Sequence, residues 1–305
     1  MANGEQKGMK LLDLLKVLRP QQWTKNIVVM AAFFFAYWDP SQHLEILPSI
    51  VAVVIATLLF CSISSGIYVL NDIADVQADR NHPHKKFRPI AAGRVSTPAG
   101  WRISIILLIG GSIGASLLSP LFFFVVASYI VMQIVYSLGL KRVAFVDIVV
   151  IAAGFVLRAL AGAVVLNIAI SPWLLLCTFL LALFLALCKR RHEKVVFNDT
   201  ANKHRPSLQK YDERLLDQMI AIISSATIVS YAIYTLSPDT IEKFDTSKLG
   251  FTIPFVVFGI FRYLDLVYRH EKGDRPEKIL LTDLPLLVNI MLYGITAILV
   301  FLLQT

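Results

Sequence analysis

The sequence predicts an all-α, polytopic membrane protein. Hydrophobic residues make up 56% of the 305 residues and charged residues only 16%, and the mean hydropathy is +0.67. A water-soluble chain of this size carries roughly a quarter charged residues, so this composition would leave too much apolar surface in water. The apolar runs are long and lack the alternation of apolar and polar residues that is typical of a transmembrane β-barrel.

Nine apolar stretches are candidate membrane spans. A helix needs about 20 residues to cross a hydrocarbon core of roughly 30 Å. The first stretch is short, and Pro20, Lys25 and Asn26 lie at its start. Residues 1–20, which precede it, are predicted to form an amphipathic, interfacial segment. The spans lie near 22–38, 47–70, 102–118, 121–137, 143–166, 172–188, 217–236, 250–268 and 284–303.

Lysine and arginine are concentrated in alternate connections. Of 29 such residues, 26 lie in the amino-terminal segment and in the connections 71–102, 139–142, 189–214 and 262–278. By the positive-inside rule the amino terminus and these connections face the cytoplasm, and nine spans then put the carboxyl terminus outside. Attraction to anionic lipid would account for part of this charge.

An acidic segment directly follows the second span. Asn71 precedes Asp72, Asp75 and Asp79. If the helix continues through Asp79, the three carboxylates share one face and repel one another. A Mg²⁺ ion would relieve this repulsion, since it typically takes one or two protein carboxylates together with water and phosphate oxygens. The sequence therefore predicts a catalytic group of these four residues with the three aspartates as metal ligands, Asp72 and Asp75 being the principal ones and Asp79 a third ligand or a supporting group. Simple pairing of the aspartates with nearby bases is the alternative.

Basic residues near the ends of several spans are candidate ligands of substrate phosphates, because guanidinium and ammonium groups suit phosphate oxygens. Tyr136 and Glu193 are further candidates for contact with substrate, and Glu193 could instead orient Arg190. Arg158 lies near the middle of its span, where it requires a buried partner. Pairing with Asp147 is its non-catalytic alternative. The substrate-binding candidates are Lys25, Arg80, His82, Lys85, Lys86, Arg88, Tyr136, Lys141, Arg158, Lys189, Arg190, Arg191 and Glu193.

The motif N-D-x-x-D-x-x-x-D at 71–79 resembles the first aspartate-rich motif of the UbiA superfamily of intramembrane prenyltransferases. The resemblance covers nearly the whole chain and includes R-P-x-Q-W-x-K-N at 19–26, Y-S-x-x-L-K at 136–141 and K-R-R-x-E at 189–193. It implies one UbiA-like transmembrane domain over 1–305, a bundle of nine helices with a cytoplasm-facing active-site cavity. The connections 71–101 and 189–216 would form that site.

One departure from the wider superfamily bears on the chemistry. Ordinary members carry a second aspartate-rich motif between the sixth and seventh spans, whereas this chain has the basic run 189–193. The chain is similar to those members that transfer 5-phosphoribosyl from phosphoribosyl pyrophosphate (PRPP) to a polyprenyl (decaprenyl) phosphate and release pyrophosphate. The resemblance implies a Mg²⁺-dependent enzyme of a bacterial plasma membrane, which feeds a lipid-linked pentose, arabinose, into cell-wall synthesis.

Two other functions fit part of the sequence. Prenyl transfer from a polyprenyl diphosphate to an aromatic or quinone-precursor acceptor fits the superfamily, but the missing second motif argues against it. A transporter or channel would place its ion site near the midplane, whereas this charge lies at the cytoplasmic rim. The expected partners are PRPP, a polyprenyl phosphate and the lipid bilayer, with no nucleic acid; a homo-oligomer is left open.

The charge asymmetry generates a topology prediction. Cysteines introduced at Lys85 and Lys203 should react with an impermeant maleimide only from the cytoplasmic side, and a cysteine at Lys243 only from outside. Labelling of intact cells and of inverted vesicles measures this directly. Reaction of the Lys203 and Lys243 positions from the same side would contradict the nine-span arrangement.

Overall fold

The computed structural model describes residues 11–81, 84–197, 210–270, 273 and 276–303, and this part of the chain is helical with short connections and without strands. The predicted site residue His82 and the labelling position Lys203 lie outside the described residues. The helices are α1 (Leu11–Leu18), η1 (Pro20–Ile27), α2 (Val28–Tyr37), α3 (Ile46–Ala74), α4 (Val76–Arg80), η2 (Lys85–Phe87), α5 (Thr97–Leu118), α6 (Pro120–Leu138), η3 (Leu140–Arg142), α7 (Val146–Leu166), α8 (Pro172–Phe197), α9 (Glu213–Leu236), α10 (Pro238–Phe244), η6 (Lys248–Thr252), α11 (Ile253–Arg269), α12 (Pro276–Thr282) and α13 (Leu284–Leu302).

Eight helical segments of the described chain are long and apolar enough to cross a membrane. They correspond to the predicted spans from 47–70 to 284–303, so the chain is a multi-pass membrane protein. The predicted first span differs, because residues 20–27 form the 3₁₀ helix η1 and only ten residues follow in α2. At about 2.0 Å per residue in a 3₁₀ helix and 1.5 Å in an α-helix, the two together reach roughly 31 Å. That length matches a hydrocarbon core, and a ninth crossing stays a prediction.

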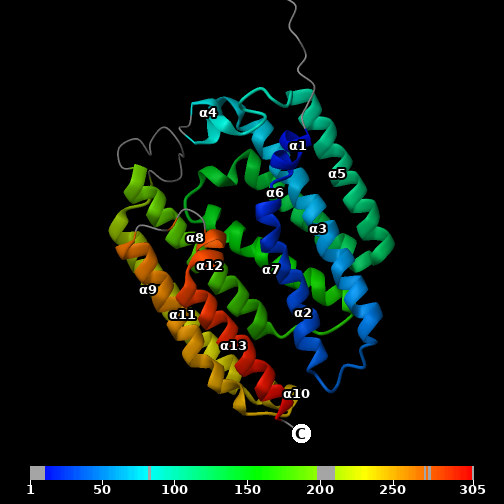
Figure 1. The fold of residues 1–305 in the computed structure, drawn as a ribbon, viewed down its shortest axis with the longest axis vertical. Helices are drawn as coiled ribbons and strands as arrows, with labels where there is room; N and C mark the ends of the chain where they lie inside the picture. The colour runs from blue at the N-terminus through cyan, green and yellow to red at the C-terminus, as the bar shows by residue number, and fades with distance from the viewer. Residues whose placement is uncertain (1–10, 82–83, 198–209, 271–272, 274–275, 304–305) are drawn as a thin grey trace, which may run out of the picture.

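Helix α7 lies between two groups of helices. Its residues Ile148 and Ala152 belong to a core cluster with α8, α9, α11 and α13, whereas Ala161 belongs to a second cluster with α2, α3, α5 and α6. Figure 1 shows α2, α3 and α5, in blue to cyan, on one side and α9, α11 and α13, in yellow to red, on the other. It also shows α1 and α4 at the opposite end of the bundle from α10 and the carboxyl terminus.

The surface of the bundle is apolar and its interior holds polar groups. Ile106 and Leu117 are 70% and 83% exposed, whereas Asp147 and Arg190 are buried. Lipid can solvate the former but not the latter, so ionisable side chains turn toward the protein interior. This distribution explains the composition, since the apolar residues cover two kinds of surface, the core and the lipid face.

A close helix contact depends on glycine. A Cβ atom placed on Gly162 in α7 would lie 2.0 Å from the carbonyl oxygen of Val29 in α2. Small residues allow such backbone approach between membrane helices, where packing contacts supply much of the association energy. The contact holds α2, and the η1 segment before it, against the central helix.

The substitution Gly162→Ala should therefore destabilise the protein. The added methyl group forces α2 and α7 apart, which costs about 1–3 kcal/mol by analogy with other overpacked sites. Gly110→Ala is the matched control, because a Cβ atom there meets nothing within 4 Å. Thermal unfolding of the detergent-purified variants measures the difference, and equal midpoints for both variants would contradict the interpretation.

Candidate active site

The acidic segment does not form one continuous helix. Helix α3 ends at Ala74, Asp75 adopts φ −97° and ψ 9°, and the short α4 begins at Val76. The break changes the direction of the chain between Asp72 and Asp79. The three carboxylates therefore do not share one face, and within the described ranges no three or more His, Cys, Asp or Glu side chains gather at one point where they could hold a metal ion together.

Asp72 and Asp79 nevertheless converge on one cation. Nη1 of Arg88 lies 3.0 Å from Oδ1 of Asp72 and 2.6 Å from Oδ2 of Asp79. Arg19 donates a second hydrogen bond to Oδ1 of Asp72. Both carboxylates are buried, at 2% and 3% exposed. Two buried acidic groups thus surround a position that holds positive charge.

Arg19 is a site residue that the sequence prediction missed. It connects α1 to η1 in the left-handed conformation, with φ 53° and ψ 58°, directly before Pro20. Its guanidinium also lies over the ring of Tyr68, 5.4 Å from the centroid. Burial lowers the pKa of the guanidinium, and the neighbouring Asp72 carboxylate opposes that shift. Its place in the R-P-x-Q-W motif was the available signal, but nothing in sequence spacing connected it to an aspartate 53 residues away.

Asp75 pairs with a cation from a different connection. Its Oδ1 lies 2.6 Å from Nζ of Lys141, which belongs to η3 between α6 and α7. Asn71, one residue before Asp72, is half-buried and its carbonyl accepts the backbone N–H of Asp75 at 2.9 Å. The predicted catalytic group and Lys141 therefore lie together, but Asp75 and the Asp72–Asp79 pair contact different cations.

Four further predicted bases are Arg80, Lys85 and Lys86, which follow α3 in the chain, and Lys25 on η1. Nε of Arg80 donates to the carbonyl of Ala91 at 3.3 Å, and Nζ of Lys86 lies 5.2 Å from the ring centroid of Phe87. Lys25 on η1 and Lys85 on η2 are half-buried. Arg80, Lys85 and Lys86 therefore share one end of the bundle with Asp72 and Asp79, because α4 and η2 directly follow α3. Lys25 lies on η1, one residue before Asn26, which binds Arg158.

The basic run at the end of α8 forms a second polar cluster. Arg190 is only 1% exposed, and it donates from Nε to Oδ2 of Asp147 at 2.9 Å and from Nη1 to Oε2 of Glu193 at 2.7 Å. Tyr136 on α6 interacts with it electrostatically. The Tyr211 hydroxyl donates to the other oxygen of Asp147 at 2.8 Å. Arg190 is thus held between two carboxylates rather than directed outward.

The neighbours of Arg190 have their own contacts. Nε of Arg191 donates to Asp217 at 2.7 Å, and its guanidinium lies 3.9 Å from the ring centroid of Tyr268. Lys189 is half-buried. Burial raises the pKa of the Tyr211 hydroxyl, and the hydrogen bond to Asp147 raises it further, so Tyr211 stays a neutral donor.

Arg158 lies apart from both clusters. It is eleven residues after Asp147 on α7, which is roughly 16 Å along the helix axis. It donates to Oδ1 of Asn26 at 2.8 Å, to the Gly154 carbonyl at 2.8 Å and to the Tyr129 hydroxyl at 2.9 Å. Among the described residues no carboxylate pairs with it, so the alternative pairing with Asp147 is wrong. Neutral acceptors and aromatic rings compensate this charge.

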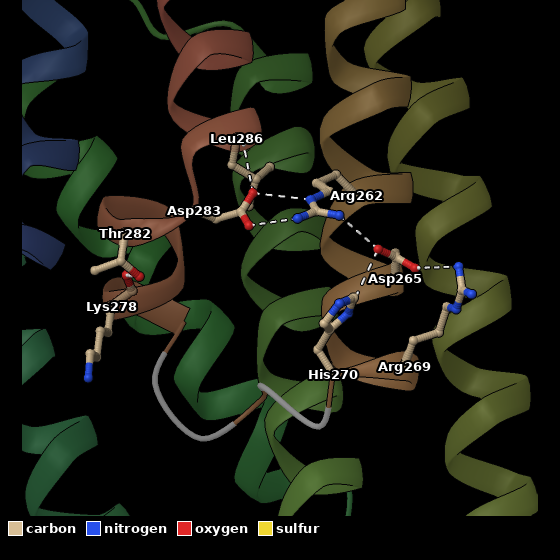
Figure 2. Close-up of polar contacts among 8 residues, drawn as sticks. All are labelled: Arg262, Asp265, Arg269, His270, Lys278, Thr282, Asp283 and Leu286. Atoms are coloured by element: carbon tan, nitrogen blue, oxygen red, sulfur yellow. Dashed lines mark hydrogen bonds and ion pairs between the residues drawn. The ribbon is translucent and has the colours of Figure 1, made fainter.

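A third polar cluster ties α11 to α13 (Figure 2). Arg262 donates to both oxygens of Asp283, at 3.1 and 2.9 Å, and to Asp265 at 2.8 Å. Asp283 also accepts the backbone N–H of Leu286, which caps α13. Helix α12 contacts η1. We interpret the cluster as a structural clamp that holds α12 beside the segment carrying Lys25.

Comparison with known proteins agrees with this architecture. Residues 27–282 match the UbiA prenyltransferase family. Proteins named decaprenyl-phosphate phosphoribosyltransferase are 35% identical in Mycolicibacterium smegmatis, over 88% of this chain and 86% of the relative, and 36% identical in Corynebacterium glutamicum, over 88% and 81%. A structure of a UbiA homolog from Archaeoglobus fulgidus bound to GPP and Mg²⁺ shares the fold, with a TM-score of 0.68 at 19% identity over 96% of this chain and 98% of that one. The chain belongs to the UbiA prenyltransferase family, a family of membrane-embedded enzymes.

Proposed function

We propose that this protein transfers 5-phosphoribosyl from PRPP to a polyprenyl phosphate, decaprenyl phosphate or a close analogue, and releases pyrophosphate. Two observations carry the proposal: the basic run at 189–191, where ordinary superfamily members have a second acidic motif, and the buried carboxylates of Asp72 and Asp79. Relatives named for this reaction match 88% of the chain. We further propose that the site and the amino terminus lie on the cytoplasmic side of a bacterial plasma membrane.

The acidic cluster is suited to hold Mg²⁺. Oxygens of Asp72 and Asp79 already converge on one positively charged nitrogen, and two carboxylates are a typical protein contribution to such a site. A bound Mg²⁺ ion would neutralise charge that develops on the departing pyrophosphate. Asp75, which faces Lys141, would support this site rather than ligate the metal.

The cations around the cluster would bind the phosphate groups of the two substrates. Arg88 and Arg19 contact carboxylates that the metal would engage, which would free their guanidinium groups for phosphate oxygens. Lys85 and Lys86 on η2 lie at the same end of the bundle, and together with Lys25 on η1 they would orient the remaining phosphates. These side chains would position the donor before the bond to its anomeric carbon breaks.

The acceptor needs no general base. A phosphomonoester has a second pKa of about 6, so its oxygen is already largely deprotonated at neutral pH. What the protein must supply is alignment of that oxygen and exclusion of competing water. Arg190 would contribute as a positioning residue, since Asp147 and Glu193 hold its guanidinium in place.

Product identification tests the reaction. Purified protein supplied with PRPP, decaprenyl phosphate and Mg²⁺ should yield decaprenylphosphoryl-5-phosphoribose and pyrophosphate, both detectable by mass spectrometry. A parallel reaction with a polyprenyl diphosphate and an aromatic acceptor is the direct comparison. If only the reaction with a polyprenyl diphosphate and an aromatic acceptor gives a product, the protein is a prenyltransferase and the proposal is wrong.

The metal assignment predicts an order among the aspartates. Asp72→Asn and Asp79→Asn should each lower turnover at least about 100-fold, because each removes a ligand that stabilises developing charge. Asp75→Asn should cost less, about tenfold, and should leave the Mg²⁺ concentration for half-maximal activity unchanged. Titration of turnover with Mg²⁺, with an EDTA blank, makes the measurement.

Asp239→Asn is the matched control, since this aspartate is exposed on α10 at the opposite end of the bundle. It should behave as the wild type. An unchanged Mg²⁺ dependence in both Asp72→Asn and Asp79→Asn would remove these residues from the metal site.

A further inference from the structure

Phe145 has the most unusual backbone conformation in the described chain. Its φ is 67° and its ψ is −44°. The other non-glycine residues with positive φ, Arg19, Asn167 and Asp245, have ψ between 35° and 58° and so lie in the ordinary left-handed region. A bulky residue outside that region is strained, and such strain persists only where neighbouring groups hold the backbone in place.

The Tyr211 hydroxyl binds the backbone N–H at this position, while the Phe145 carbonyl accepts the N–H of Val149 at 3.1 Å. The hydroxyl accepts the backbone N–H of Phe145 at 2.7 Å and donates to Oδ1 of Asp147 at 2.8 Å. The two aromatic rings pack edge to face, with centroids 5.2 Å apart. Tyr211 and Asp147 are buried, at 1% and 0% exposed, and Arg190 holds the other oxygen of Asp147. One hydroxyl thus connects the strained backbone to the buried ionic cluster.

The strained residue controls the direction of a short connection. Lys141, four residues before Phe145, contacts Asp75 of the acidic cluster, while Asp147, two residues after it, contacts Arg190. The intervening backbone is tight, because the N–H of Val143 donates to the carbonyl of Leu140 at 3.0 Å. A change of φ at Phe145 would therefore turn Lys141 relative to Asp75.

We propose that Tyr211 is a positioning residue whose hydroxyl holds Phe145 in its strained conformation and thereby places Lys141 in the acidic cluster. The polar cluster around Arg190 at the end of α8 is then connected physically to the cluster of Asp72, Asp75 and Asp79 at the end of α3. The kinetic part of this inference rests on the proposed function, whereas the structural part does not.

Tyr211→Phe isolates the hydroxyl, because it keeps the ring contact. Hydrogen exchange followed by mass spectrometry on the full chain in nanodiscs should show the Phe145 amide exchanging at least about tenfold faster than in the wild type. In the transfer assay kcat/KM for PRPP should fall about tenfold, as loss of one buried hydrogen bond allows, while KM for decaprenyl phosphate changes less than twofold. Tyr263→Phe is the control, since Tyr263 is buried in the same core cluster but packs on Phe184.

Phe145→Gly in the Tyr211→Phe background supplies a rescue. Glycine adopts positive φ without the steric penalty of a side chain, so the native backbone conformation no longer needs the hydroxyl. The double variant should recover kcat/KM for PRPP to within about threefold of Phe145→Gly alone. A purely structural hydroxyl would give no such recovery.

Two results would overturn the inference. One is unchanged amide exchange and unchanged kinetics in Tyr211→Phe. The other is a loss in Tyr211→Phe that affects both substrates equally and that Phe145→Gly does not relieve. If wild-type protein fails to use PRPP, the proposed function fails, and the exchange experiment still decides whether Tyr211 holds Phe145.

Discussion

The structure depends on one electrostatic constraint: each buried charge must find its compensation within the protein, because lipid provides none. The pairs that meet this constraint join residues far apart in sequence. Arg19 and Asp72 are separated by 53 residues, Lys141 and Asp75 by 66. These contacts join η1, α3 and η3 at one end of the bundle. The ion pairs that form the candidate site therefore also hold these segments together.

Much of the fold could be predicted because membrane spans are encoded by length and hydropathy. Eight predicted spans are confirmed by long apolar helices, with most boundaries shifted by a few residues. Helix α8 extends further, to Phe197, beyond the predicted end at 188. The break at Asp75 could not be predicted, since neither of its neighbours, Ala74 and Val76, is a proline or a glycine. The sequence correctly placed Asp72, Asp79 and Arg88 in one region. The sequence predicts Asp75 on the same helix face as Asp72 and Asp79 only if the helix is continuous, and the helix is broken at Asp75.

Ionic partners were harder to predict than helices. The sequence offers Asp147 as a partner of Arg158 on its own helix, yet Asp147 pairs with Arg190 on α8, 43 residues away. Helical periodicity identifies neighbours within one helix, but contacts between helices depend on how α7 and α8 cross. Tyr211 was missed as a functional residue for the same reason. In this structure Arg190 is enclosed by two carboxylates, and its role as a phosphate ligand stays a prediction.

The arginine in the middle of α7 has a consequence for assembly in the membrane. Insertion scales assign an arginine at the centre of a span a cost of about 2.5–3.5 kcal/mol, against about 0.3–0.6 kcal/mol gained from each Leu, Ile, Val or Phe. The many apolar residues of Val146–Leu166 can carry Arg158 into the bilayer on their own. Its acceptors Asn26 and Tyr129 precede it in the chain, so both are synthesised before α7 emerges. The amino-terminal helices thus offer a preformed polar surface to the helix that follows, and the order of synthesis is the order in which this charge can be satisfied.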